Sequence, residues 1–179
     1  MRGINVGGRN KIPMAELKLR LEELGFEGVA PYIQSGNVVL RSELDTETVT
    51  AKIEDMLPRR FTLDSPTIRV VAFEHETFKE IVMQAPADFG AAPASFRYNV
   101  VFLMDSNPAE AMQQIEVREG VDAAYQGEHA IYFRNSKENA SKSRLSRIAQ
   151  QPIYSSITIR NWNTTTKLLE LLEAEAHRI

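Results

Sequence analysis

Apolar positions along this chain recur at two spacings, every three or four residues in some stretches and every second residue in others, which predict helices and strands respectively. In the first half, Pro13 and Gly25 flank the clearest helical stretch and are typical of a helix start and a helix end. Pro31 marks the first strand-like run as an edge strand, and Asp45 suits an N-cap. The elements predicted here are a helix at 13–24, strands at 29–34 and 37–42 joined at Ser35-Gly36, a helix at 46–57, a strand at 67–72 and a helix at 74–84.

The same order of elements recurs after residues 85–96, a stretch rich in Ala, Pro and Gly that has no periodicity and is predicted to be a linker. Asn107 and Pro108 suit the N-cap and the first position of a helix, and Asn163 is predicted to cap the C-terminal helix. The elements predicted here are a strand at 97–104, a helix at 107–115, a hairpin of 121–125 and 130–133 around Gly127, a helix containing Leu145 and Ile148, a strand at 155–160 and a helix at 164–176.

Written as elements, each half is βαββαβ followed by one further helix. This order predicts an α+β protein made of duplicated βαββαβ (ferredoxin-like) halves, at 1–84 and 97–179, on either side of the linker. The tripeptide Thr-Ile-Arg occurs at 67–69 and again at 158–160, in the last predicted strand of each half, which agrees with a duplication.

Composition narrows the classes of function. The formal net charge is −3, from 21 basic and 24 acidic side chains, which argues against a general nucleic-acid coat but permits local basic patches. Cysteine is absent, which excludes disulfides, thiolate metal sites and a cysteine nucleophile. We find no signal-peptide pattern and no apolar run near the roughly 18 residues of a membrane span, so we expect a cytoplasmic protein. The three histidines are scattered, so no metal site is predicted, and no residue is nominated as a general base.

The opening loop, residues 1–11, is the strongest candidate for a binding site. It holds three glycines, two asparagines and three cations with no acid, and a predicted helix follows it. Glycines permit positive φ, so backbone N–H groups can turn toward an anion, to which the positive end of the helix adds attraction. In a βαββαβ unit this loop lies at the same sheet end as the 34–37 turn and residues 58–60. The ligand-binding residues predicted here are Arg2, Asn5, Gly7, Gly8, Asn10, Lys11, Gln34, Ser35, Gly36 and Asn37.

A second group of polar residues stands in the second half. The stretch 134–147 carries five cations and one acid, and the last predicted strand is expected to end near it. The ligand-binding residues predicted here are Arg144, Arg160, Asn161, Trp162 and Asn163, with Trp162 as a stacking face. If the two halves pack with these ends together, both groups line one groove.

The leading prediction is therefore a protein that binds a phosphate-bearing small ligand or nucleotide through its Gly-rich cationic loop. Arg9-Asn10 replaces the Lys-Ser/Thr of a P-loop, which excludes a Walker-type NTPase. One alternative is an RNA-binding module, although its aromatic residues, Tyr98, Phe102, Tyr132 and Phe133, suit a core equally well. Another is a structural or partner-binding protein whose polar motifs are architectural. Cofactor, catalysis and oligomeric state stay open, and no membrane partner is expected.

Four segments of the chain match motifs of a known family. They are Arg2-Gly-Ile-Asn-Val-Gly-Gly8, Tyr32-Ile-Gln-Ser-Gly-Asn-Val-Val39, Ser143-Arg144-Leu145, which is similar to a Ser-Lys-Leu segment, and Arg160-Asn-Trp-Asn-Thr164. Through them the chain resembles an uncharacterised bacterial family, domain of unknown function 1697 (DUF1697), over nearly its whole length. The resemblance implies an α+β fold with two ferredoxin-like halves and no established activity. Family members usually carry a few apolar residues before the Arg-Gly-Ile-Asn segment, so we expect the native start to lie upstream of Met1.

Overall fold

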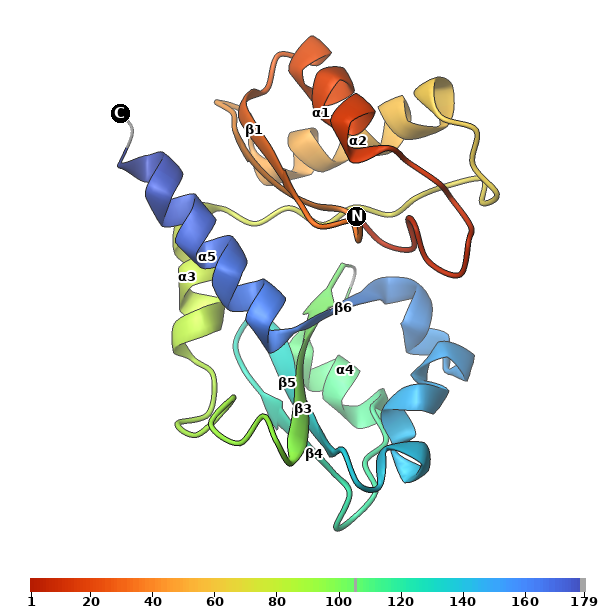
Figure 1. Cartoon of the computed structure of the whole chain (residues 1–179), viewed down its shortest axis with the longest axis vertical. Coiled ribbons are helices and arrows are strands. Elements are labelled where there is room, and N and C mark those ends of the chain that lie inside the picture. The colour runs from red at the N-terminus through yellow and green to blue at the C-terminus, as the bar shows by residue number, and fades with distance from the viewer. Residues whose placement is uncertain (105, 178–179) are drawn as a thin grey trace. The chain divides into compact units, whose positions relative to one another are not determined.

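The computed structural model describes residues 1–104 and 106–177, in which five α-helices and two antiparallel sheets form a mixed α+β fold (Figure 1). Asp105 and residues 178–179, which the predicted second half includes, lie outside the described residues. The chain divides into two compact units, unit 1 (Met1–Glu74 and Glu170–Ile179) and unit 2 (His75–Leu169). The division predicted from the sequence, into halves 1–84 and 97–179 with a linker between them, stays a prediction.

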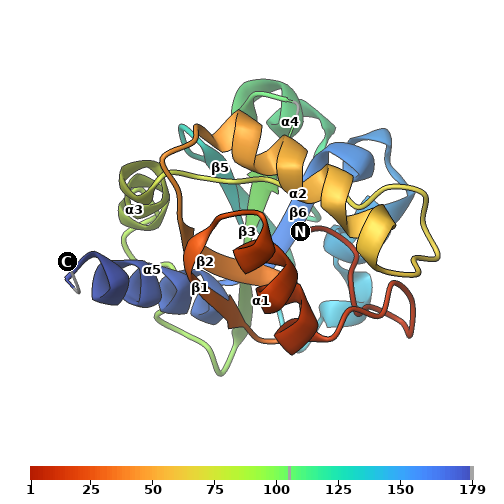
Figure 2. The same cartoon turned by 90° about the horizontal axis from the view of Figure 1, so that it is seen from above.

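Unit 1 is built on a β-hairpin with two helices over one of its faces (Figures 1 and 2). Its elements are α1 (Met14–Glu23), β1 (Glu27–Tyr32), β2 (Asn37–Arg41) and α2 (Thr46–Arg60), and β1 pairs with β2 antiparallel. Asp45 accepts a hydrogen bond from the Thr48 N–H at 2.7 Å, which confirms the predicted N-cap of α2. The apolar faces of the two helices meet in the core of this unit, where Leu17, Leu21, Ile53 and Leu57 are buried.

Two strands that the βαββαβ pattern requires in the first half do not form. The opening residues contain only an isolated bridge between Val6 and Arg9, because positive φ angles at Gly3 and Asn5 prevent an extended chain. Residues 67–72 also carry no strand. A backbone bond from the Arg2 N–H to the Arg69 carbonyl, at 2.8 Å, ties this segment to the opening residues, whereas the Val70 N–H donates to the Glu54 carboxylate of α2.

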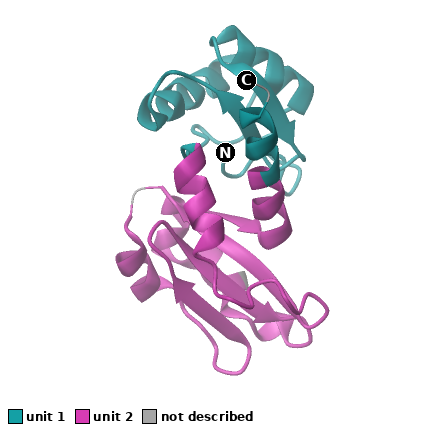
Figure 3. Ribbon diagram, turned by 90° about the vertical axis from the view of Figure 1, so that its left-hand side faces the viewer, with its two compact units in different colours: residues 1–74, 170–179 teal, residues 75–169 magenta. Residues whose placement is uncertain are grey.

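Unit 2, coloured magenta in Figure 3, holds a four-stranded antiparallel sheet whose strand order is β4-β5-β3-β6. Asn107 accepts a hydrogen bond from the Glu110 N–H at 2.9 Å, so the predicted cap of the helix after β3 is confirmed. The elements are α3 (His75–Met83), β3 (Phe96–Leu103), α4 (Pro108–Gln114), β4 (Asp122–Gln126), β5 (Ala130–Ser136), β6 (Ile157–Asn161) and α5 (Trp162–Ala176), whose last residues, from Glu170 on, belong to unit 1.

The helix predicted around Leu145 and Ile148 is replaced by three short 3₁₀ helices, Ala140–Lys142, Arg144–Gln150 and Pro152–Ser156. Ser143 and Gln151, which separate them, both have extended backbone angles. Gln151 precedes Pro152, and a proline disfavours the α conformation of the residue before it. A continuous α-helix therefore cannot pass through this segment.

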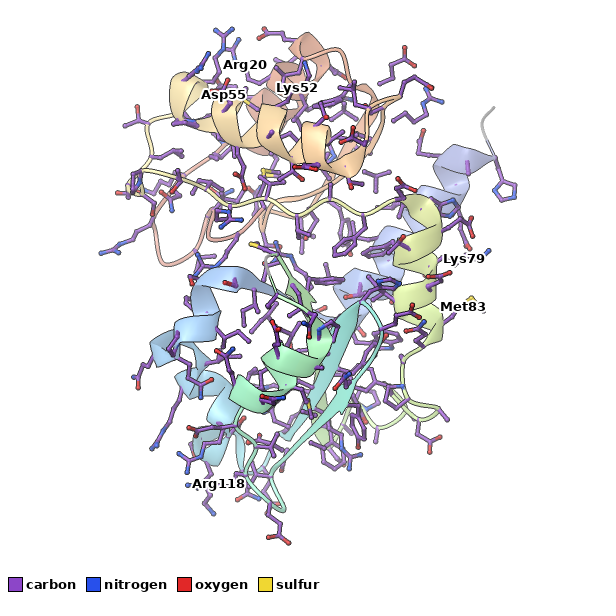
Figure 4. All side chains as sticks on the ribbon, turned by 180° about the vertical axis from the view of Figure 1, so that it is seen from behind. Arg20, Lys52, Asp55, Lys79, Met83 and Arg118 are labelled. Atoms are coloured by element: carbon purple, nitrogen blue, oxygen red, sulfur yellow. The ribbon has the colours of Figure 1, made fainter. Side chains whose placement is uncertain are left out.

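Both faces of the sheet in unit 2 are covered. On one face Val101, Ile131 and Phe133 pack with α4 and the 3₁₀ segments. On the other face α3 lies over the sheet with Phe78 stacked on Phe102 at 5.9 Å, while Lys79 and Met83 point away from it (Figure 4). No helix among the described residues is long and apolar enough to cross a membrane.

The phenol of Tyr132 ties α3 to this sheet and supplies a test of the packing. Its hydroxyl donates to the Ile81 carbonyl at 2.5 Å, and burial raises the pKa of Tyr132 to about 12. We expect Tyr132→Phe to cost about 1–2 kcal/mol at neutral pH, because a buried carbonyl of the last helical turn loses its donor. Since the folded pKa lies above the ordinary value of 10.0, the stability from the neutral phenol is complete below pH 10 and is lost toward pH 12. Urea unfolding at several pH values in this window should show a smaller loss of unfolding free energy in the variant than in the parent.

Candidate functional site

Asn5 fixes the base of the opening loop. Its side-chain Nδ2 donates to the carbonyls of Ile12 and Gln34 at 2.9 and 2.8 Å, and its Oδ1 accepts from the Ile12 N–H at 2.8 Å. Both N–H bonds of the amide are therefore used within unit 1. The φ of Asn5 is +53°, an unusual value that asparagine tolerates better than most residues. Asn5 thus shapes the loop and joins it to the hairpin turn between β1 and β2.

Asn10 makes a second and more buried set of bonds. Its Oδ1 accepts from the N–H groups of Asp64 and Ser65 at 2.9 and 3.0 Å, and its Nδ2 donates to the Gly3 carbonyl at 2.9 Å and to the Ser65 hydroxyl at 3.2 Å. The Asn10 N–H in turn donates to the Asp64 carboxylate at 2.6 Å. With φ at +46° and 5% of its surface exposed, Asn10 is a structural clamp between the loop and residues 64–65.

The hairpin turn packs against the start of the chain. Gly36, at φ +79°, lies so close to Ile4 that an added Cβ would be 2.8 Å from two of its side-chain atoms. Asn37 donates from Nδ2 to the Tyr32 carbonyl and the Ser35 hydroxyl, at 3.3 and 3.0 Å, so its amide supports the turn itself. Ile33 has φ +50° and a half-exposed side chain, a combination that a β-branched residue adopts only under strain.

The tip of the loop is exposed and cationic. Val6 to Arg9 form a tight turn closed by the bond from the Arg9 N–H to the Val6 carbonyl at 3.0 Å, with positive φ at Gly7 and Gly8. Neither glycine N–H has a backbone acceptor among the described residues. The side chains of Arg9 and Lys11 are exposed and form no ion pair in the described part of the chain. The structure thus joins the base of the opening loop to the 34–37 turn through Asn5, and it adds Arg9 to the predicted residues at the exposed tip.

The residues predicted at the end of β6 have partners within unit 2. Asn161, rather than the predicted Asn163, caps α5, because its Oδ1 accepts from the Thr164 N–H at 2.7 Å and the helix already begins at Trp162. Trp162 packs edge-on against Phe89 with ring centres 5.2 Å apart. Arg160 donates to the Thr158 hydroxyl and the Ile159 carbonyl at 2.8 and 2.9 Å, and burial lowers the pKa of its guanidinium.

Arg144 does not join this group. Its backbone N–H donates to Asp122 at the start of β4, at 2.9 Å, and its side chain pairs with Glu116 at 3.6 Å. β4 and β6 are opposite edges of the sheet, with β5 and β3 between them, which separates the two places by roughly 14 Å at the usual strand spacing. Arg144 therefore lies apart from the end of β6. The basic stretch itself begins at Arg134 in β5, and the ends of β5 and β6 both pair with the first residues of β3, at the same end of the sheet. Whether the groups of unit 1 and unit 2 share a groove stays a prediction.

The aromatic residues considered for RNA binding are in the core of unit 2. Tyr98, Phe102, Tyr132 and Phe133 are at most 7% exposed. A base can stack only on a ring face that solvent reaches, so these four side chains are unavailable for that role. A groove of about 410 Å³ on unit 1, lined by Lys18, Arg41, Glu22 and Glu175 together with residues 28–30, includes none of the predicted residues and has balanced charges.

The fold and the clamped loop define a mixed α+β protein with two compact units, and the matches to known proteins agree with that class. The chain belongs to the DUF1697 family, described as "Protein of unknown function (DUF1697)", whose model matches residues 1–132. It is also similar to a solved structure, that of the conserved bacterial protein SP0830 from Streptococcus pneumoniae. The two share 29% sequence identity at a TM-score of 0.76, over 96% of this chain and 94% of the other. No curated protein matches the chain.

Proposed function

We propose that this protein binds a small phosphate-bearing ligand, a metabolite or a nucleotide, at the tip of the opening loop of unit 1. The observation that carries the proposal is a strained loop, held in one conformation by two asparagine side chains, that exposes two backbone N–H groups and two cations. Gly7 and Gly8 would supply the N–H groups, with Arg9 and Lys11 supplying charge.

Backbone strain supports this proposal. Asn5, Asn10 and Ile33 all have positive φ, and such residues cost of order 1–3 kcal/mol each. Asn5 and Asn10 belong to the opening loop itself. Ile33 lies beside that loop, because the next residue, Gln34, accepts a hydrogen bond from Asn5. If the loop served only to connect the opening residues to α1, a chain with fewer strained residues could make the same connection. Rigidity fixed in advance favours binding, because the loop loses little freedom when a ligand arrives.

Charge supports it as well. Asp64, an acid that contacts the loop, binds the Asn10 N–H at the base of the loop and not at its tip. Exposed N–H groups beside two cations form an anion-binding surface that needs no metal. The amides of Asn5, Asn10 and Asn37 are engaged in holding the backbone, so their expected contribution is to position the tip and not to contact the ligand.

The experiment is a thermal-shift and calorimetric titration with inorganic pyrophosphate and ATP, comparing the parent with Arg9→Ala/Lys11→Ala. We expect both probes to raise the midpoint of the parent, since a ligand that binds the folded state stabilises it by mass action. Loss of two charge-assisted contacts should weaken binding about tenfold or more. Lys52→Ala, an exposed lysine of α2 in the same unit (Figure 4), is the matched control and should bind as the parent does.

Two results would overturn the proposal. If neither probe binds the parent, the opening loop is architectural, and the structural alternative replaces it. If short RNA binds instead, with an affinity that falls steeply with salt and rises with length, the nucleic-acid alternative replaces it.

We also propose that the two halves of the chain, 1–84 and 97–179, descend from one duplicated βαββαβ arrangement and are joined by the linker at 85–96. We propose further that the protein acts in the cytoplasm. The strand order of unit 2, with β3 between β5 and β6, supports the ferredoxin-like arrangement there. In unit 1 the Met1 amino group donates to the Gly36 carbonyl and the Arg2 N–H donates to the Arg69 carbonyl. These two bonds support our proposal that the opening residues correspond to the central strand. Hydrogen exchange at Arg2 and Val70 that is slow enough for strand residues would support this relation.

A further inference from the structure

Asp122 and Asn135 face each other across β4 and β5 in unit 2. They are register partners, and the neighbouring pair exchanges a backbone bond from the Ser136 N–H to the Val121 carbonyl at 2.9 Å. Bonded and non-bonded pairs alternate in an antiparallel ladder, so Asp122 and Asn135 form a non-bonded pair, the kind with the closest side chains. Their polar ends therefore share one face of the sheet at short range.

Only one of the two oxygens of the Asp122 carboxylate accepts hydrogen bonds from the described residues. Its Oδ2 accepts from the N–H groups of Arg118 and Arg144 at 3.0 and 2.9 Å, whereas its Oδ1 is buried without a hydrogen-bond partner among the described residues. Asn135 is 3% exposed, and its Oδ1 is likewise buried with no partner in the described part of the chain. Its Nδ2 makes one long contact, to the Ser136 carbonyl at 3.5 Å.

Two buried acceptors cannot satisfy each other. An unsatisfied buried oxygen is costly, and more so when it carries charge. A donor or a cation completes this pair: either the Asn135 Nδ2 itself, after a half-turn of the amide, or a group from outside the pair. Carboxylate and amide oxygens are the ligands that hard cations such as Mg²⁺ and Ca²⁺ take in proteins.

We propose that the Asp122 and Asn135 side chains bind a hard metal cation through their Oδ1 atoms, beneath the Ser143-Arg144 segment. The neighbouring Glu116 carboxylate is paired with the Arg144 guanidinium, so this ion pair adds no net charge beside the site. Because the same Asp122 carboxylate holds the Arg144 N–H, a cation at this place would fix the start of the second 3₁₀ helix. The site is separate from the anion-binding surface of unit 1 and does not depend on it.

The test uses two substitutions with opposite expected effects. In Asp122→Asn, the new Oδ1 keeps both backbone N–H partners while the new Nδ2 donates to the Asn135 oxygen. The metal-free variant should therefore unfold at a higher temperature than the parent, and cations should no longer shift its midpoint. In Asn135→Asp, two carboxylates face each other, so the metal-free midpoint should fall and the cation-induced rise should exceed that of the parent.

The measurements are thermal unfolding and calorimetric titration of the full chain with MgCl₂, CaCl₂ and NaCl after chelation, against choline chloride at equal ionic strength. A rise of about 2–4 °C or more in the parent, absent in Asp122→Asn, supports the site, and the salt that produces it identifies the cation. Glu119→Gln, an exposed carboxylate nearby, is the control and should respond as the parent does. The proposal is overturned if no cation shifts the parent, or if Asp122→Asn lowers the metal-free midpoint, which would mean that the Asn135 amide or a water already donates to Asp122.

Discussion

Asn10→Ala is expected to lower the free energy of unfolding by roughly 3 kcal/mol, one of the largest effects of any single substitution in unit 1. The change deletes an acceptor for two backbone N–H groups, of Asp64 and Ser65, and a donor to the Gly3 carbonyl. The site is nearly closed to solvent, so the groups left behind gain little water. The alanine must also adopt the φ of +46°, which asparagine tolerates better. Urea unfolding followed by far-UV circular dichroism measures the loss.

Asn10→Gly separates the two causes. Glycine loses the same hydrogen bonds but accepts positive φ freely, so it should be about 1 kcal/mol more stable than the alanine variant. Lys11→Ala changes the next residue, which is exposed, and should have the same free energy of unfolding as the parent. If Asn10→Ala also has the free energy of unfolding of the parent, the hydrogen bonds of the Asn10 side chain contribute nothing measurable to stability. The loop is then not clamped. The ligand test described above would then lose its structural basis, because the tip would not be held in advance.

Local signals in the sequence predicted much of the fold. The caps Asp45 and Asn107 were predictable because an N-cap bonds a residue only three positions away. The strands of unit 2 were predictable because their apolar runs lie between clear turn residues. The strand at 67–72 was predicted wrongly, since alternation alone cannot show that the Val70 N–H bonds a side chain of α2. The choice between Asn161 and Asn163 failed because helix ends are uncertain by one or two residues.

The candidate site was only partly readable from sequence. Glycine and asparagine content indicated positive φ in the opening loop, and Asn5 and Asn10 do have it. Their bonding was not visible, because the partners of Asn10 stand 54 and 55 positions along the chain. Asp122 and Asn135 were missed for a similar reason, as their pairing depends on strand register. The available signal was a polar residue, Asn135, among the apolar residues of β5. It becomes informative only once that side of the strand is known to be buried.

Gly90→Ala is expected to be the most disruptive small substitution in unit 2. Gly90 has φ +97°, and an added Cβ would lie 2.6 Å from Cδ1 and Nε1 of the Trp162 indole. The ring cannot easily retreat, because it packs edge-on against Phe89, which itself contacts Tyr98 and Tyr132. Overpacking of this kind costs typically about 1–3 kcal/mol beyond the backbone strain. Since Trp162 is the single tryptophan of the chain, its fluorescence reports the displacement directly.

Gly120→Ala is the matched control for that substitution. Gly120 has φ +73° and no atom within 4 Å of an added Cβ, so it carries comparable backbone strain without the clash. We expect Gly90→Ala to be about 2 kcal/mol less stable than Gly120→Ala, with a changed emission maximum in the first variant and an unchanged one in the second. Equal stabilities and equal spectra would show that the indole moves freely. In that case Trp162 would again be available as a stacking face for a ligand, whereas an indole held by Phe89 and Gly90 serves the core of unit 2.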